Sequence, residues 1–283
     1  MIEPASRYHR VLMCPPTYFT VRDIKNPFMN PGRPPDRALA VHQWEALRAA
    51  FEQAGVQSVF VNPVADLEDM VFAANQAFIG RGTIHERFAV PSRMRYPSRQ
   101  REVPFVATRL GELGVEIIDL ELKDEGEFLE GHGDLLVHPG RPHVWAAYGA
   151  RSSRSGVMRF ATAVKREGIG VTPLELVDET FYHLDTCFAP LSAQAALVYP
   201  GALSERSFRL LRQAWPRLHA VSREDAARFV CNGVAVNDYF IVSHLPEDAD
   251  RFVRNEGLTP LRVDLSEFEK AGGSVFCMKA FLD

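Results

Sequence analysis

The feature that most limits how this chain can fold is a pattern repeated five times, in which an amphipathic, helix-like segment is followed closely by a short apolar strand. The five predicted helix and strand pairs are 37–53 with 56–61, 106–113 with 115–120, 157–167 with 171–177, 205–215 with 218–221, and 248–255 with 261–265. Gly55, Gly114 and Gly257 stand between helix and strand, where glycine ends a helix by adopting a left-handed conformation.

Each of these strands is followed by more strand-like sequence rather than by another helix. The further strands are predicted at 70–79, 135–137 with 144–148, 183–190 with 196–199, 235–236 with 239–242, and 275–281. A Rossmann or barrel fold alternates single strands and helices, whereas here each helix comes with about three strands. Five such units cannot each bury their own apolar face, so we expect one α/β domain over residues 1–283, with the units packed radially around a shared centre.

Composition and charge exclude several classes of protein. The net charge is −4, so there is no basic field to recruit nucleic acid or an anionic membrane. No apolar run approaches the roughly 20 residues of a membrane span, and residues 1–10 are polar, unlike a signal peptide. Cys14, Cys187, Cys231 and Cys277 are scattered without a CxxC pair, which favours free thiols in a reducing compartment. We expect a cytoplasmic protein with a small-molecule ligand and leave homo-oligomerisation open.

The segment Glu130-Gly131-His132-Gly133-Asp134 is a cramped acidic loop. One interpretation is a hairpin turn built from glycine and aspartate. The other is a carboxylate pair, Glu130 and Asp134, that orients a histidine or holds a cation.

In a strand over 183–190, alternation would place His183, Asp185 and Cys187 on one face. Such a polar face is costly inside an apolar strand unless it lines a polar cavity. The alternative is a buried histidine satisfied by its aspartate. Metal ligation is less favoured, because no second local histidine cluster is present.

Near the C-terminus, Gly272 and Gly273 precede Cys277. Paired glycines let a backbone approach a ligand closely, and a cysteine just beyond them can face a cavity. The alternative is a buried structural thiol.

In the segment 68–75, Asp69 and Asn75 would lie at the two ends of an apolar strand. Arg87 and Arg151 stand in predicted loops, where most arginines are solvated charges. The segment 81–104, dense in arginine and proline, is expected to form a substrate lid.

Taken in order, these segments resemble the guanidino-group-modifying superfamily known as the penteins. It includes dimethylarginine dimethylaminohydrolases, arginine deiminases, arginine dihydrolases and amidinotransferases. The resemblance covers essentially the whole chain, and the segments that carry it are 13–16, 26–29, 69–72, 130–134, 183–185 and 272–277. It implies a five-fold pseudosymmetric α/β propeller of ββαβ-type units, with the active site in the central channel and no cofactor or metal.

By this resemblance, Cys277 matches the family's nucleophile, His183 its general acid/base and Glu130 the carboxylate that orients the histidine. Asp185 resembles the aspartate that grips the guanidinium group. The other substrate-binding residues expected in the matched segments and loops are Asn26, Asp69, Asn75, Asp134, Arg87 and Arg151, with the two arginines binding the α-carboxylate.

Asn75 departs from the deiminase and dimethylargininase pattern, which usually has a second carboxylate at this position. The dihydrolase branches have a similar asparagine, and the Asn26-Pro27-Phe28-Met29 segment also resembles free-arginine dihydrolases. An asparagine amide can donate to a neutral ureido oxygen, which an ionised aspartate cannot do. We therefore expect a covalent cysteine hydrolase that converts arginine to ornithine, carbon dioxide and ammonia.

Three alternatives remain. A dimethylargininase or arginine deiminase would stop at citrulline, and an amidinotransferase would need an amine acceptor. A non-catalytic arginine-binding protein would bind arginine without turnover, but it would have no use for a nucleophile.

Overall fold

The computed structural model describes residues 8–122 and 124–283; residues 1–7, part of the polar N-terminal segment considered above, and residue 123 lie outside the described residues. In the described part, the strands form five three-stranded sheets with the orders β15-β1-β2, β3-β4-β5, β6-β7-β8, β9-β10-β11 and β12-β13-β14. Their bounds are β1 Arg10–Met13, β2 Gln57–Phe60, β3 Ala77–Gly80, β4 Phe88–Pro91, β5 Glu116–Ile117, β6 Leu135–Val137, β7 His143–Tyr148, β8 Gly170–Glu175, β9 Phe188–Pro190, β10 Ala195–Val198, β11 Arg217–Ala220, β12 Val234–Val236, β13 Tyr239–Val242, β14 Thr259–Arg262 and β15 Ala280–Phe281.

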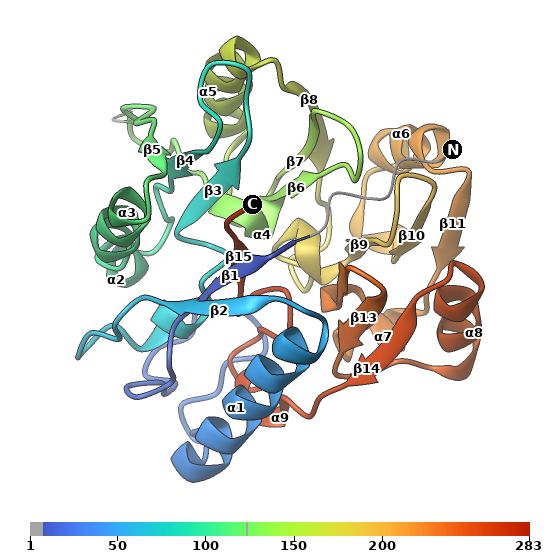
Figure 1. Ribbon diagram of the computed structural model, residues 1–283, viewed down its shortest axis with the longest axis horizontal. Coiled ribbons are helices and arrows are strands. Elements are labelled where there is room, and N and C mark those ends of the chain that lie inside the picture. The colour runs from blue at the N-terminus through green and yellow to red at the C-terminus, as the bar shows by residue number, and fades with distance from the viewer. Residues whose placement is uncertain (1–7, 123) are drawn as a thin grey trace.

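Every sheet is built in the same way. Its first strand pairs antiparallel with the middle strand, and the middle strand pairs parallel with the third across a helix. These crossover helices are α1 Arg37–Gln53, α3 Val103–Glu112, α5 Arg154–Val164, α6 Glu205–Ala214 and α8 Glu247–Asn255. Figure 1 shows the helices at the rim and the first strands around the centre. The predicted ββαβ propeller is therefore confirmed.

The two ends of the chain meet in one sheet. Strand β15, the last in the chain, pairs antiparallel with β1, so that Val11 lies opposite Phe281 and Leu12 opposite Ala280. Strand β1 also pairs parallel with β2, which follows α1. The first sheet is thus completed only by the C-terminal strand, which closes the ring (Figure 1).

The helix ends follow local signals in the sequence. The Asp36 side chain accepts hydrogen bonds from the first backbone amides of α1, and Ser153 and Ser204 cap α5 and α6 in the same manner. Gly55 and Gly114 follow helices α1 and α3 with φ angles of 79° and 76°, the left-handed conformation predicted for them.

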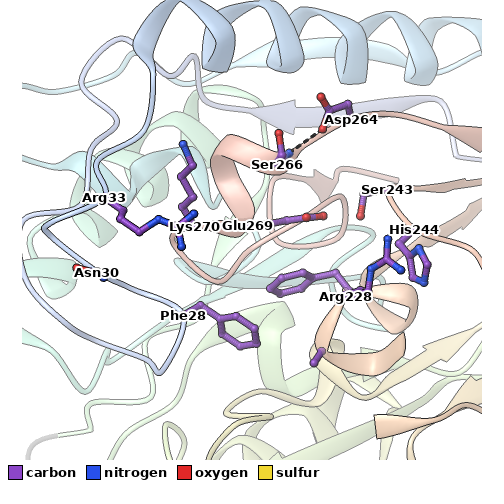
Figure 2. A pocket seen from close by; sticks show the side chains of 12 residues that line it. Phe28, Asn30, Arg33, Arg228, Ser243, His244, Asp264, Ser266, Glu269 and Lys270 are labelled. Atoms are coloured by element: carbon purple, nitrogen blue, oxygen red, sulfur yellow. Dashed lines mark hydrogen bonds between the residues drawn. The ribbon is translucent and has the colours of Figure 1, made fainter. Parts of the chain in front are cut away.

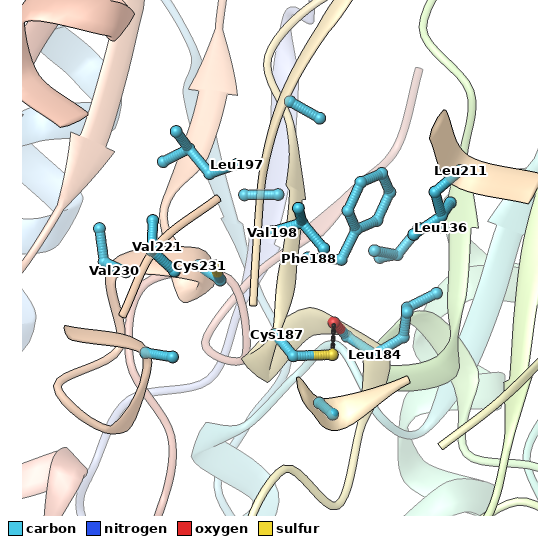
Figure 3. Close-up of a cluster of buried hydrophobic side chains, with 14 of the residues drawn as sticks. Leu136, Leu184, Cys187, Phe188, Leu197, Val198, Leu211, Val221, Val230 and Cys231 are labelled. Atoms are coloured by element: carbon cyan, nitrogen blue, oxygen red, sulfur yellow. Dashed lines mark hydrogen bonds between the residues drawn. The ribbon is translucent and has the colours of Figure 1, made fainter. Parts of the chain in front are cut away.

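The core consists of apolar clusters between sheets and helices. Figure 3 shows part of one cluster, in which the free thiols of Cys187 and Cys231 lie among leucine, valine and phenylalanine side chains. Burial raises the pKa of both thiols, so they are inert packing groups. No helix in the described part of the chain is long and apolar enough to cross a membrane.

Three predicted strands begin later than expected. The segment 70–79 contains the end of the 3₁₀ helix η1 (Glu68–Val71) and a turn before β3, and 183–190 contains the 3₁₀ helix η3 (Leu184–Thr186) before β9. Residues 275–278 also form a turn. The prediction that His183, Asp185 and Cys187 share one strand face is therefore wrong, as is the placement of Asp69 and Asn75 at the ends of a strand.

Contacts across the channel explain this difference. Instead of pairing in a ladder, backbone amides of these segments bond to neighbouring segments: Ala74 N donates to Cys277 O at 3.0 Å, and Leu184 N to Asp134 Oδ1 at 3.2 Å. The acidic loop likewise forms one helical turn, α4 (Gly131–Asp134), so the hairpin interpretation is wrong.

Candidate active site

A narrow cavity of about 10 Å³ lies at the end of the central channel where the first strands begin. Turns before β3, β9 and β15 and loops after β1, β4 and β7 supply its walls. The residues that line it are Lys25, Asn26, Met29, Asp69, Phe72, Asn75, Arg99, Arg151, Tyr182, His183, Ala271, Gly273 and Cys277. Six of the residues predicted from the sequence are thus brought together here.

Two side chains from distant segments of the chain hold the Cys277 thiol in place. Its thiol donates to Asp185 Oδ2 at 3.1 Å and lies 3.3 Å from Asn232 Nδ2. Asn232, at the end of the 3₁₀ helix η5 (Val230–Asn232), also accepts from the backbone amides of Ser274 and Cys277 at 3.1 and 3.4 Å. Burial and then the Asp185 carboxylate raise the pKa of the thiol well above its ordinary value. The Cys277 thiol is therefore protonated in this structure.

His183 belongs to a buried network centred on Glu130. His183 Nε2 lies 2.9 Å from Glu130 Oε2, and Arg151 Nη2 lies 2.8 Å from the same oxygen. The backbone amide of Arg95 and Arg151 Nε both bond to the other oxygen of Glu130, at 2.9 and 3.0 Å. Burial alone would raise the pKa of Glu130, but Arg151 and His183 outweigh it and hold that pKa well below its usual range. Glu130 is therefore an ionised carboxylate in contact with the imidazole.

Asp134 lies next to His183 but does not line the cavity. Its Oδ2 lies 3.9 Å from His183 Nε2 and accepts from Ser152 Oγ at 2.6 Å. Its Oδ1 accepts from Leu184 N, so it fixes the turn that carries the histidine. Burial raises the pKa of Asp134 to about 6. The expectation that Asp134 contacts substrate is replaced by a positioning role.

Asp69 and Asn75 line the cavity with polar atoms that have no hydrogen bond to any described residue. Asp69 Oδ2 lies 3.0 Å from Lys25 Nζ, whereas Oδ1 is unpartnered. Asn75 Oδ1 accepts from Arg99 Nη1 at 3.1 Å, which leaves its Nδ2 unpartnered. Behind the thiol, Asp185 Oδ1 is unpartnered too. Buried polar atoms without partners are costly, so these three point to a polar ligand that both donates and accepts hydrogen bonds.

Three charged or polar residues of the site are not predicted by the sequence motifs: Lys25, Arg99 and Asn232. Arg99, in the short helix α2 (Pro97–Gln100), is buried and paired with Glu102 three residues later. The three-residue spacing of Arg99 and Glu102 indicates an ion pair within one helical turn. The density of arginine and proline over 81–104 predicts a lid instead. The structure makes Arg99 part of the cavity wall.

Arg87 is the predicted site residue that the structure places elsewhere. It precedes β4 and is half-buried, and its carbonyl accepts from Glu116 N at 3.1 Å. Strand β4 runs toward the cavity, so the residues after it, including Arg99, reach the site while Arg87 lies at the far end of the sheet.

Glycines let the site segments approach one another. A Cβ atom on Gly133 would lie 2.4 Å from Asn75 Nδ2 and 3.1 Å from the His183 ring. One on Gly273 would lie 2.3 Å from the Phe72 ring. The close backbone approach predicted at Gly272 and Gly273 therefore makes room for neighbouring side chains. Asn26 is seated against Gly272 and donates to Ala271 O at 2.9 Å.

Arg151 lies between two aromatic rings, 4.9 Å from the centre of Tyr96 and 5.4 Å from that of Tyr182. Its position is fixed by these rings and by Glu130. Within residues 8–122 and 124–283, no group of three or more histidine, cysteine or acidic side chains is arranged to hold a metal ion.

Comparison with known proteins shows the family to which this chain belongs. A family model described as N,N dimethylarginine dimethylhydrolase, eukaryotic, matches residues 16–282. The N(G),N(G)-dimethylarginine dimethylaminohydrolase of Mycobacterium tuberculosis is 36% identical over 274 residues, which cover 96% of this chain and 85% of that protein. The bifunctional arginine dihydrolase/ornithine cyclodeaminase ArgZ of Synechocystis is 34% identical over 272 residues, which are 95% of this chain but only 37% of that longer protein.

The fold has a similar counterpart among solved structures. The N-terminal domain of a substrate-bound ArgZ mutant, an arginine dihydrolase from cyanobacteria, superposes with a TM-score of 0.88 at 31% identity, covering 96% of this chain and 97% of that one. The resemblance to the penteins, near their arginine dihydrolase members, is confirmed. The chain belongs to the N,N-dimethylarginine dimethylhydrolase family, whose members are hydrolases that act on guanidino C–N bonds.

Proposed function

We propose that this hydrolase is an arginine dihydrolase, in which arginine and two water molecules give ornithine, carbon dioxide and two molecules of ammonia. Cys277 acts as nucleophile, His183 as general acid/base and Glu130 as the carboxylate that orients His183. Asp69, Asn75, Asp185, Asn26 and Arg151 bind the substrate. The observation that carries the proposal is the unpartnered Nδ2 of Asn75.

The amide of Asn75 has one orientation in this site. Its oxygen accepts from Arg99, whose guanidinium is in turn fixed by Glu102 and the carbonyl of Asp69, so its NH₂ group is left for a ligand. A guanidinium group offers only donors, whereas the ureido group of citrulline has a carbonyl oxygen. A donor at this position stabilises the ureido intermediate, which must stay bound for a second hydrolysis.

The carboxylates suit the first hydrolysis. Guanidinium binding places a cation against Asp69 and Asp185, which have unpartnered oxygens. That positive charge lowers the pKa of the Cys277 thiol and produces the thiolate when substrate is present. The thiolate attacks the guanidino carbon, and His183 donates a proton to the departing ammonia, which leaves a thiouronium. His183 then accepts a proton from water, which attacks this carbon and releases citrulline and the thiolate.

The second hydrolysis repeats these steps on the ureido carbon. The thiolate adds to it, ammonia leaves with a proton from His183, and water releases the N-carboxylated amine. Loss of carbon dioxide from that amine gives ornithine. The amino acid end of the substrate is anionic at its α-carboxylate, and Lys25, Arg99 and Arg151 line the cavity with positive charge.

A second candidate is a dimethylargininase that stops at citrulline. The description of the matched family and the M. tuberculosis relative favour it. The bifunctional ArgZ, a relative of similar identity, supports the dihydrolase proposal instead.

Product analysis separates the two. We would incubate the purified protein with arginine, asymmetric dimethylarginine and citrulline, beside Cys277→Ser. Ornithine and ammonia from arginine, absent with Cys277→Ser, support the dihydrolase. Citrulline alone, formed mainly from dimethylarginine, establishes the dimethylargininase instead. Asn75→Asp then tests the role of the amide, because it should shift the products of arginine from ornithine toward citrulline; an unchanged ratio contradicts that role.

A further inference from the structure

A second cavity occupies the opposite end of the central channel. It has a volume of about 420 Å³ and is lined mainly by hairpin ends of the sheets, including Ile79, Val137, Leu191, Ala235, Phe276 and Phe281. The first strand of each sheet runs from the active-site end to this end, so the two cavities lie at opposite ends of one channel. We call this one the rear cavity. Its size and apolar walls are those of a small-molecule site.

A buried cation lies in this apolar setting. Lys279 lines the rear cavity with only 2% of its surface exposed. Its backbone amide donates to Phe276 O at 3.4 Å, but its Nζ makes no hydrogen bond or ion pair with any described residue. Its Nζ lies 3.3 Å from the centre of the Phe276 ring and 4.9 Å from that of Phe281. Two aromatic faces compensate only part of the cost of removing an ammonium group from water. An anion is the partner that this position lacks.

The other charged groups around the rear cavity do not supply that anion. Asp283 is engaged by Arg10, at 3.5 Å from its Nε, and by the backbone amides of His9 and Arg10. Arg141 is exposed and adds a second unpaired positive charge. His132 has both ring nitrogens engaged, by Ile79 N and Leu135 O, and burial lowers its pKa to about 3, so it is neutral.

We propose that the rear cavity binds a small organic carboxylate with an aromatic or branched apolar body, whose carboxylate pairs with Lys279 and whose body packs against Phe276 and Phe281. The pairing is charge-assisted and sheltered from water, which makes it stronger than the same pair on the surface. Burial of the apolar part of the ligand against the cavity walls contributes the rest of the binding free energy.

The rear cavity and the active site share a wall. Phe276 and Lys279 line the rear cavity, whereas Cys277 between them lines the active site. The positive charge of Lys279 also acts on Asp185 and Cys277. A carboxylate that pairs with Lys279 cancels this charge and makes the thiolate harder to form. The bound anion therefore slows turnover from outside the active site, a consequence that rests on the proposed function, whereas binding itself does not.

The binding test uses 4-fluorophenylacetate as probe, observed by ¹⁹F NMR, with 4-fluorobenzyl alcohol and 4-fluorobenzylamine as neutral and cationic counterparts. We expect the carboxylate to bind more tightly than either counterpart. Lys279→Met should weaken its binding by about tenfold to a hundredfold, the range for losing one charged hydrogen-bond partner, while Lys279→Arg retains it. Arginine added to Cys277→Ser should not displace the probe.

A matched control comes from a separate surface cavity of about 500 Å³, shown in Figure 2, where Lys270 pairs with Glu267. Lys270→Met should leave probe binding unchanged. If Lys279→Met does not fold, Ala235→Phe, which fills the rear cavity while keeping the lysine, decides instead and should abolish binding. Equal binding of the three probes, unchanged binding in these rear-cavity variants, or displacement by arginine overturns the proposal. These outcomes do not depend on catalysis, so a failed turnover assay would leave them readable.

Discussion

The Cys277 thiol donates a hydrogen bond to Asp185 Oδ2 across 3.1 Å, so the proposed nucleophile contacts a carboxylate. The contact aims the sulfur, but it also suppresses ionisation, since burial and Asp185 both raise the pKa of the thiol. In the proposed mechanism, a cationic substrate reverses this effect when it binds. The thiol would then become reactive only in the presence of substrate.

Thiol alkylation should reveal this suppression. Iodoacetamide should modify Cys277 slowly at pH 7.5, and faster as the pH rises, because only the thiolate reacts. Asp185→Asn removes the negative charge, lowers the pKa of the thiol and should accelerate alkylation at pH 7.5. Mass spectrometry would locate the label, with Cys277→Ser as the blank. Equal rates for Asp185→Asn and the wild type would show that Asp185 does not hold the proton on sulfur.

Glu130→Gln should reduce kcat by roughly 10²- to 10⁴-fold, the usual contribution of general acid/base catalysis, because His183 loses the carboxylate that orients it. The change also leaves Arg151 without its buried counter-charge, which costs about 3–5 kcal/mol of stability. Steady-state kinetics and urea unfolding measure the two effects. The control is Glu167→Gln, which removes a buried carboxylate outside the site. In the wild type, Glu167 Oε1 lies 2.7 Å from His85 Nδ1. This substitution should affect stability alone, and a comparable loss of kcat in that variant would contradict the assignment.

Lys279 should make stability depend on pH in a defined direction. Burial lowers its pKa from 10.5 to about 7, whereas the unfolded chain keeps the ordinary value. Between those values the unfolded state binds more protons, so this group makes stability rise with pH; below about pH 7 its burial penalty is complete. The stability of Lys279→Met relative to the wild type should therefore increase as the pH falls from 10 to 7. Urea unfolding at pH 6, 8 and 9.5 measures the difference, and a constant difference would mean that the ammonium is not desolvated.

Replacing glycine by alanine should lower stability at Gly133 and raise it at Gly111. Gly133→Ala forces a Cβ against Asn75 and His183, and we expect at least a tenfold lower kcat with about 1–3 kcal/mol of destabilisation from overpacking. Gly111, within α3, has no heavy atom within 4 Å of such a Cβ. Gly111→Ala should add about 0.5–1 kcal/mol of stability without altering kcat, because alanine is the better helix former. Thermal unfolding and kinetics of the pair provide the comparison.

The architecture was predictable because it follows from local signals that repeat. The bounds of α1 match the predicted 37–53, and Gly55 and Gly114 adopt the conformation expected of glycines that end helices. The turns of the site were not predictable in this way. The alternation around His183 and Asp185 looks like a strand, but hydrogen bonds to distant segments override it.

The candidate site was only partly predictable for a similar reason. Cys277 and His183 stand in distinctive motifs, whereas Asn232 is a single polar residue whose importance comes from contacts 42 to 47 positions away in the sequence. Arg87 precedes β4 and Arg99 follows it, so the direction of β4 decides which of the two arginines lies at the cavity. That direction is set by the pairing of β4 with β3 and β5 and cannot be predicted from the local sequence pattern.

Cys277 lies three residues before β15, the strand that joins the end of the chain to its beginning. The pairing that seals the propeller therefore also delivers the sulfur to its place beside Asp185. Without β15 the other four sheets would be complete, but nothing would hold the sulfur beside Asp185 and Asn232. Closure of the ring and assembly of the candidate site are thus one structural event.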